Sequence, residues 1–199
     1  MKRYEVIITD DMLIKGVNAL SLVEEPATKN IWLTLNKEEE LLQLKAIDSE
    51  KHILMGVVLI PDVDIPRLGK NGEDDFTIKF SNQTIEKAQE LFFKNSFQNS
   101  TTIEHNKQPL SDNTVVESWI VEDVEKDKTA LYNLNAPIGS WVVKMKINNE
   151  EVWTDYVKTG KVKGFSIEGF FKPVEITEMS IEFTDEQKVD KIKELINEL

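Results

Sequence analysis

The sequence contains no cysteine and only two histidines, and these shortages restrict its chemistry. Without cysteine the chain has no disulfide, no thiol nucleophile and no thiolate ligand for a metal. Histidine is the usual general base near neutral pH because its unperturbed pKa is about 6.5. Any serine–histidine chemistry must therefore use His52 or His105. The same shortage disfavours a zinc site, and we expect neither a metal nor a cofactor.

Long apolar runs are also missing, since no stretch approaches the roughly 18 to 20 apolar residues that a membrane helix needs. The N-terminal "MKRYEVIITDD" has two basic residues but no apolar segment after them, so we expect no secretory signal. The net charge is −12, from 36 acidic and 24 basic residues. Such a surface repels phosphates, and the sequence therefore predicts neither a nucleic-acid partner nor a membrane partner.

Most of the remaining pattern is typical of short strands separated by turns. β-Branched and aromatic residues recur, and several segments alternate apolar and polar side chains as half-buried strands do. The segment 61–75 carries two prolines, two glycines and several acids, which predicts an exposed loop. The predicted strands are 3–10, 31–35, 52–60, 76–80, 101–105, 114–121, 139–147, 164–171 and 174–183.

Helices are fewer, and the clearest internal one begins after Ser81 or Asn82, with 85, 88, 91 and 92 on its apolar face. A second helix is predicted over 150–159, ending at Gly160. A capping box at Thr184 and Gln187 precedes an amphipathic C-terminal helix. These patterns predict a β-rich α+β fold, a barrel or closed sheet with peripheral helices. We divide the chain into a domain at 1–178 and a C-terminal strand end and helix at 179–199.

The stretch "GFSIEGFF", residues 164–171, places a serine between two glycines. It is not the nucleophile elbow of α/β-hydrolases, because GxSxxG is one residue longer than GxSxG and strand residues follow the serine. Strand alternation puts Ser166 and Glu168 on one face and the mostly apolar set on the other. The two glycines would let another backbone approach closely. The residues alone favour an ordinary solvent-facing strand serine.

Glu117 in "VVESWIV" is a carboxylate between valines and a tryptophan within a predicted strand. A buried carboxylate needs an ion pair or hydrogen bonds, so it faces either a partner or an exposed surface. His105 ends a predicted strand before a polar loop, and His52 opens the apolar segment 52–60. Each histidine taken alone is also compatible with a simple surface role.

Several blocks in this order resemble the XkdF-type serine proteases of tailed bacteriophages, relatives of the prohead (capsid maturation) proteases. The C-terminal helix lies outside the resemblance, which spans most of residues 5 to 172. The blocks are "ALSLVEEPAT", "GVVLIPDVDIPR", "FTIKFSNQTIEKAQELFF", "IEHN" followed by "VVESWIVED", "GSWVVKMKI" and "VKGFSIEGFF".

The resemblance implies a fold like that of herpesvirus assemblin, with Ser166 as nucleophile and His105 as general base. Assemblin-like enzymes use a second histidine after the serine, and this chain has none there. Glu117 is therefore our first candidate for the third catalytic residue and Glu168 the alternative. His52 from upstream, or a dyad without a third residue, completes the set of options.

The function implied by the resemblance is a serine endopeptidase that processes scaffold and major capsid proteins during phage head maturation. It would work in the host cytoplasm within the assembling procapsid, and the C-terminal helix is a candidate for docking on scaffold or for homo-oligomerisation. The absent downstream histidine favours an alternative, a non-catalytic virion or scaffold-associated module that keeps the protease fold. A β-domain that binds a peptide along a strand edge is a third interpretation.

Overall fold

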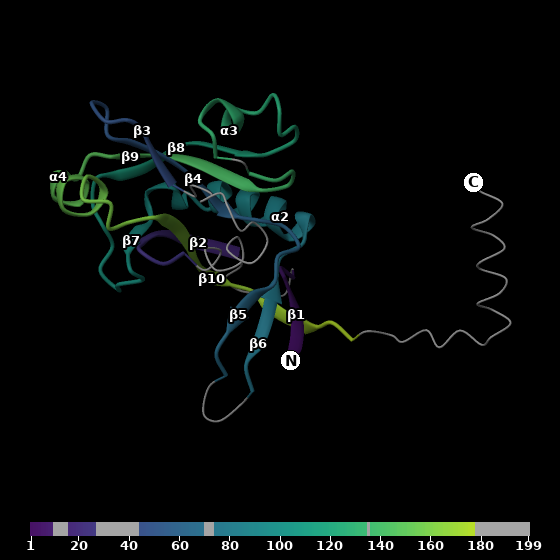
Figure 1. The fold of residues 1–199 in the computed structure, drawn as a ribbon. Helices are drawn as coiled ribbons and strands as arrows, with labels where there is room; N and C mark the ends of the chain where they lie inside the picture. The colour runs from purple at the N-terminus through teal and green to yellow at the C-terminus, as the bar shows by residue number, and fades with distance from the viewer. Residues whose placement is uncertain (10–15, 27–43, 70–73, 135, 178–199) are drawn as a thin grey trace, which may run out of the picture.

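The computed structural model describes residues 1–9, 16–26, 44–69, 74–134 and 136–177, and these form three small sheets with few helices (Figure 1). The fold is therefore mixed α+β and rich in strands, as the sequence predicts. The elements are β1 (Lys2–Ile7), β2 (Gly16–Val23), β3 (Leu44–Asp48), β4 (Ile53–Leu59), β5 (Ile65–Arg67), β6 (Phe76–Lys79), α2 (Asn82–Lys94), the 3₁₀ turn η1 (Phe97–Asn99), β7 (Thr101–Ile103), β8 (Asn113–Ile120), α3 (Lys128–Leu131), β9 (Trp141–Ile147), α4 (Glu150–Val152), the π turn η2 (Trp153–Val157), β10 (Gly164–Phe170) and β11 (Lys172–Glu175).

The three sheets do not close into a barrel, which corrects the prediction of a barrel or closed sheet. Their strand orders are β11-β1-β6-β5, β10-β2-β7 and β3-β4-β9-β8, and each sheet keeps its own edges within the described residues. Three or four strands are too few to close on themselves, so the sheets bury their apolar faces by packing against one another. Sequence alternation reports a buried face, but it does not tell a packed pair of sheets from a barrel.

One large core lies between the β10-β2-β7 sheet, the β3-β4-β9-β8 sheet and α2. Alternate residues of β9 at 141, 143, 145 and 147 are fully buried in it. Helix α2 buries the face predicted from the sequence and stacks Phe92 edge-to-face on Trp141, with ring centres 5.5 Å apart. The opposite faces of β4 and β9 bury Met55 and Val142 in a second cluster, together with Val121 and Leu134.

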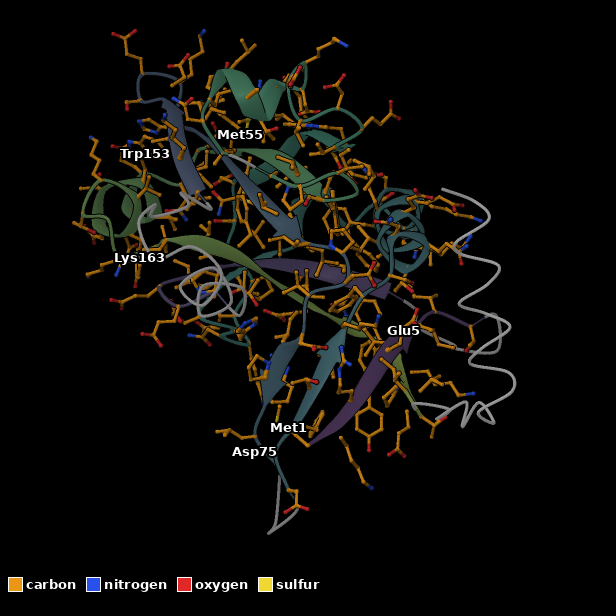
Figure 2. All side chains as sticks on the ribbon, turned by 45° about the vertical axis from the view of Figure 1, so that its right-hand side comes forward. Met1, Glu5, Met55, Asp75, Trp153 and Lys163 are labelled. Carbon is orange, nitrogen blue, oxygen red and sulfur yellow. The ribbon has the colours of Figure 1, made fainter. Side chains whose placement is uncertain are left out.

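The sheet β11-β1-β6-β5 projects as an arm from the body that the other two sheets form (Figure 1). In Figure 2 Met1 and Asp75 lie at the tip of the arm, whereas Met55 and Trp153 lie in the body. Strand β5 falls inside the segment predicted as a loop, because a three-residue strand containing a proline gives almost no periodic signal. Strand β10 leads almost directly into β11 and so connects the body to the arm.

Several sequence predictions can be compared with these elements. The predicted internal helix is α2, and Ser81 is its N-terminal cap residue, although its hydroxyl contacts Thr84 Oγ1 instead of a backbone amide. The predicted helix at 150–159 is the short α4 followed by the π turn, with Gly160 at φ +69°. The predicted strand 31–35, the residues of 174–183 from 178 onward and the C-terminal helix lie outside the described residues.

Gly169 generates a first prediction, because a Cβ there would lie 2.3 Å from the Gly16 carbonyl oxygen at a β-bulge between β10 and β2. Gly169→Ala should lower the free energy of unfolding by about 2 kcal/mol through this clash. Urea denaturation followed by circular dichroism measures it. Gly160→Ala is the control, since its Cβ meets no described atom within 4 Å and only its positive φ costs about 1 kcal/mol. Equal losses in the two variants would refute the steric explanation.

Candidate active site

Strand β10 presents Ser166 and Glu168 on the face away from the core, as strand alternation predicts. Phe165 is 2% exposed and Ile167 packs against the main core, so the apolar side chains do point inward. From the sequence we expected Gly169 to let another backbone approach closely. It accommodates the chain's own backbone at Gly16.

The outer face of the β10-β2-β7 sheet aligns three hydroxyl residues across three strands. Ser166 on β10 lies directly opposite Ser21 on β2, and Ser21 lies opposite Thr102 on β7. Directly opposed residues of neighbouring strands share a face of the sheet. Ser21 is fully buried and Thr102 is 7% exposed, whereas Ser166 is partly open to solvent. Ser166 is therefore the hydroxyl of this row that a ligand can reach.

His105 reaches this row from a tight turn that follows β7. Glu104 and His105 both have positive φ, 48° and 54°, and the Asn106 amide donates to the Ile103 carbonyl at 2.8 Å. These are the features of a type I′ turn, which normally uses asparagine or glycine because left-handed backbone is costly for other residues. The His105 amide donates to Ser21 Oγ at 3.0 Å and the Glu104 amide to the Leu22 carbonyl, which holds the turn on β2.

The imidazole of His105 lies along β10 and meets both residues of its outer face. Its Nε2 is 3.1 Å from Ser166 Oγ, and its Nδ1 is 3.3 Å from Glu168 Oε1. A carboxylate beside Nδ1 favours the tautomer that carries its proton there, which leaves Nε2 free to accept from the serine hydroxyl. The three side chains therefore have the order of a serine–histidine–carboxylate triad.

Glu168 is held in this position by Thr102, whose hydroxyl donates a short hydrogen bond to the same oxygen, Oε1. Residues two apart on a strand are about 6.6 Å apart, and our preference for Glu117 rested on this separation between Ser166 and Glu168. The ring itself spans that gap, because its two nitrogens face successive residues of one strand face. Ser21 and Thr102 also hold the site, although the sequence did not predict a role for either residue. Only the pairing register of the three strands reveals them.

Glu117, our first candidate for the third residue, is not brought to this pair. It lies on β8 directly opposite Lys144, and its two oxygens bind Lys128 at 2.6 Å and Lys144 at 3.1 Å. The hydrogen bond from Lys128, and then that from Lys144, holds the pKa of the Glu117 carboxyl below its ordinary value of 4.5. Its partners are therefore two lysines, and of the two candidate carboxylates the structure places Glu168 beside His105.

His52 lies in the turn between β3 and β4 and is likewise separate from Ser166 in its contacts. Its ring stacks on Trp153 with centres 4.4 Å apart, and its Nδ1 is 3.8 Å from Glu150 Oε2. These contacts describe a structural role for the ring at the edge of the core.

Two general features of the described residues complete the site. They contain no group of three or more histidine, aspartate or glutamate side chains placed to hold a metal ion. Among the same residues, no helix is long and apolar enough to cross a membrane.

Comparison with known families identifies one match. Residues 40–175 match the model of the family described as "Putative phage serine protease XkdF", and because this is well over half of the chain, the protein belongs to that family. The matched range includes every side chain of the candidate triad. No curated protein and no solved structure matches the chain, so the assemblin-like fold stays a prediction.

The lysine pair around Glu117 generates a prediction about stability. The pKa of the Glu117 carboxyl is lowered in the folded state, so its ionised form stabilises the fold above pH 4.5. This contribution disappears as the pH falls through the folded-state pKa. Glu117→Gln should therefore cost at most about 1 kcal/mol at pH 7, because the side chain is 38% exposed, and nothing at low pH. Unfolding curves of both proteins at pH 7 and pH 3 test this. A penalty that persists undiminished at pH 3 would contradict the ion-pair explanation.

Proposed function

We propose that the protein is a serine endopeptidase in which Ser166 is the nucleophile, His105 the general base and Glu168 the residue that orients the base. The observation that carries the proposal is the placement of His105 between the other two, with Nε2 3.1 Å from Ser166 Oγ and Nδ1 3.3 Å from Glu168 Oε1. Membership of a phage serine protease family supports the same reaction class.

In the proposed reaction His105 Nε2 takes the Ser166 proton as Oγ attacks a peptide carbonyl carbon. The imidazolium that forms is stabilised by the Glu168 carboxylate at Nδ1. His105 then returns the proton to the leaving amine as the peptide C–N bond breaks, and an acyl-enzyme remains on Ser166. A water molecule, deprotonated by the same nitrogen, hydrolyses this ester and restores the serine hydroxyl.

Access to the site suits an extended peptide. Strand β10 pairs only with β2 among the described strands, so its other edge can accept a substrate as an added strand. The side chains of His105 and Glu168 are 45% and 32% exposed, so the triad opens directly onto the surface. A polypeptide lying along β10 would cover these groups and exclude water from the reacting carbonyl.

The biological substrates that we propose are scaffold and major capsid proteins of the phage head. Prohead proteases act on such proteins inside the procapsid, and the resemblance of this chain to their relatives supports the same setting. The net charge of −12 is compatible with that setting and is not specific to it.

Processing in cells tests the whole proposal. The chain is co-expressed with the scaffold and capsid genes of its own phage, and cleavage products are identified by mass spectrometry. Ser166→Ala and His105→Ala should each abolish cleavage, while circular dichroism shows that both variants fold. Cleavage that continues in both variants would refute the assignment, and an intact substrate with the wild-type protein would favour the non-catalytic module.

The third residue has its own test. Glu168→Gln should reduce the rate of Ser166 labelling by a fluorophosphonate by roughly 10²- to 10⁴-fold, because the histidine tautomer and its developing charge lose their partner. Glu117→Gln is the matched control and should label at the wild-type rate. The reverse result, with Glu117 essential and Glu168 dispensable, would restore our first sequence-based candidate.

A further inference from the structure

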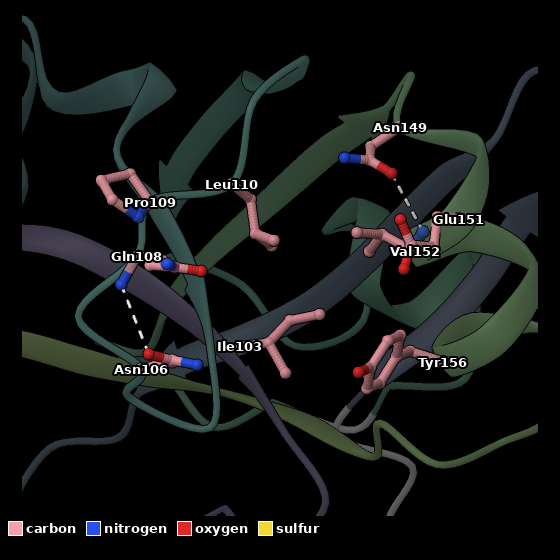
Figure 3. A pocket seen from close by; sticks show the side chains of 9 residues that line it. All are labelled: Ile103, Asn106, Gln108, Pro109, Leu110, Asn149, Glu151, Val152 and Tyr156. Atoms are coloured by element: carbon pink, nitrogen blue, oxygen red, sulfur yellow. Dashed lines mark hydrogen bonds between the residues drawn. The ribbon is translucent and has the colours of Figure 1, made fainter.

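A pocket of about 260 Å³ lies beside the turn that carries His105 (Figure 3). One wall consists of the chain on either side of the turn, including Ile103 and Asn106, and the other comes from α4 and η2. Small-molecule sites typically measure roughly 300 to 1,000 Å³. This smaller volume suits a side chain of a bound polypeptide better than a drug-sized ligand.

Two asparagine amides at the pocket have a fixed orientation. Asn106 Oδ1 accepts from the Gln108 amide at 3.4 Å, and Asn149 Oδ1 accepts from the Val152 amide at 3.1 Å (Figure 3). A backbone amide can donate only to the oxygen, so each asparagine leaves its Nδ2 group for another partner. Neither Nδ2 donates a hydrogen bond within the described part of the chain. The pocket therefore presents hydrogen-bond donors.

The same pocket contains one charged lining side chain, Glu151, which makes no ion pair with any described residue. Lys161 is not among the lining residues, and its Nζ lies over the Tyr156 ring at 5.2 Å. Ile103 and Val152 contribute apolar surface between the polar groups. A matching ligand must thus accept from amides, donate to a carboxylate and bury a short apolar stem.

We infer that this pocket is a specificity subsite for a neutral carboxamide side chain, glutamine or asparagine, of the polypeptide substrate. The ligand's carbonyl oxygen accepts from Asn106 and Asn149, its amide nitrogen donates to Glu151, and its methylene groups lie on Ile103 and Val152. A glutamate side chain of the same shape binds more weakly because its charge would meet the Glu151 carboxylate. That the ligand belongs to a polypeptide substrate rests on the proposed protease function, whereas the chemistry of the ligand rests on the pocket alone.

A direct binding experiment separates the pocket from the protease chemistry. The isotope-labelled full chain is titrated with N-acetyl-glutamine N-methylamide and with the corresponding glutamate compound, and NMR follows the Asn106 and Asn149 side-chain amides. We expect saturable shifts with the glutamine compound and binding about tenfold weaker with the glutamate compound. Glu151→Gln should remove this difference. Equal binding of the two compounds, or no shift of these amides, would overturn the inference.

Cleavage of a peptide library tests the role in specificity. Peptides from a digested bacterial proteome are incubated with the protein, and mass spectrometry reads the residues around each new terminus. One position should favour glutamine over glutamate by about tenfold, and Glu151→Gln should reduce that ratio by about tenfold. Glu150→Gln is the matched control, since Glu150 is adjacent and faces His52 instead of the pocket.

The two hypotheses fail in different ways. A protein whose Ser166 is labelled by a fluorophosphonate, but which shows no carboxamide preference in either experiment, retains the protease function and loses the subsite. A protein that binds the glutamine compound at these amides without labelling at Ser166 loses the protease function and retains the pocket chemistry.

Discussion

The contact on which the candidate site depends is the hydrogen bond from the His105 amide to the buried hydroxyl of Ser21. It holds His105 in left-handed backbone, which costs roughly 1–2 kcal/mol for each such residue. Glu104 shares that conformation, and its carboxylate accepts from the Glu24 amide at 2.6 Å. Because several hydrogen bonds to β2 and its end fix this turn, the strain is retained, and the imidazole lies along β10 between Ser166 and Glu168.

The three hydroxyl residues on the outer sheet face differ in their contacts. Ser21 is buried and accepts from the His105 amide, Thr102 donates to the Glu168 carboxylate, and Ser166 is the most accessible of the three. The three come from strands far apart in sequence, brought together by one antiparallel and one parallel pairing. The register of β2 against both neighbours therefore determines the geometry, and a shift of β2 by one residue would turn Ser21 toward the core and remove it from between Ser166 and Thr102.

The sequence could predict what depends on local periodicity and composition. The two faces of β10, the buried face of α2 and the restriction of the base to two histidines all follow from it. It could not predict that Lys144 lies opposite Glu117, because strand pairing is a property of the whole sheet. The choice of Glu117 over Glu168 took the spacing of about 6 to 7 Å between residues two apart on a strand as too long for Glu168 to reach behind the imidazole. The left-handed turn at His105, which no residue type at that position signals, makes the ring lie along the strand.

The turn that carries the base also forms a wall of the neighbouring pocket, since Ile103 and Asn106 flank the two left-handed residues. The same strained turn therefore shapes one wall of the pocket and orients the imidazole of His105. Substitutions in this wall would disturb His105 and the pocket together. Glu151, on the opposite wall, belongs to α4. Among the described residues it makes no hydrogen bond or ion pair with the turn or with the candidate triad. A substitution on the α4 wall, such as one at Glu151, would therefore change the pocket without changing the orientation of His105. In the other direction, a side chain bound between the two walls would restrict the motion of the turn and so favour the conformation in which His105 meets Ser166.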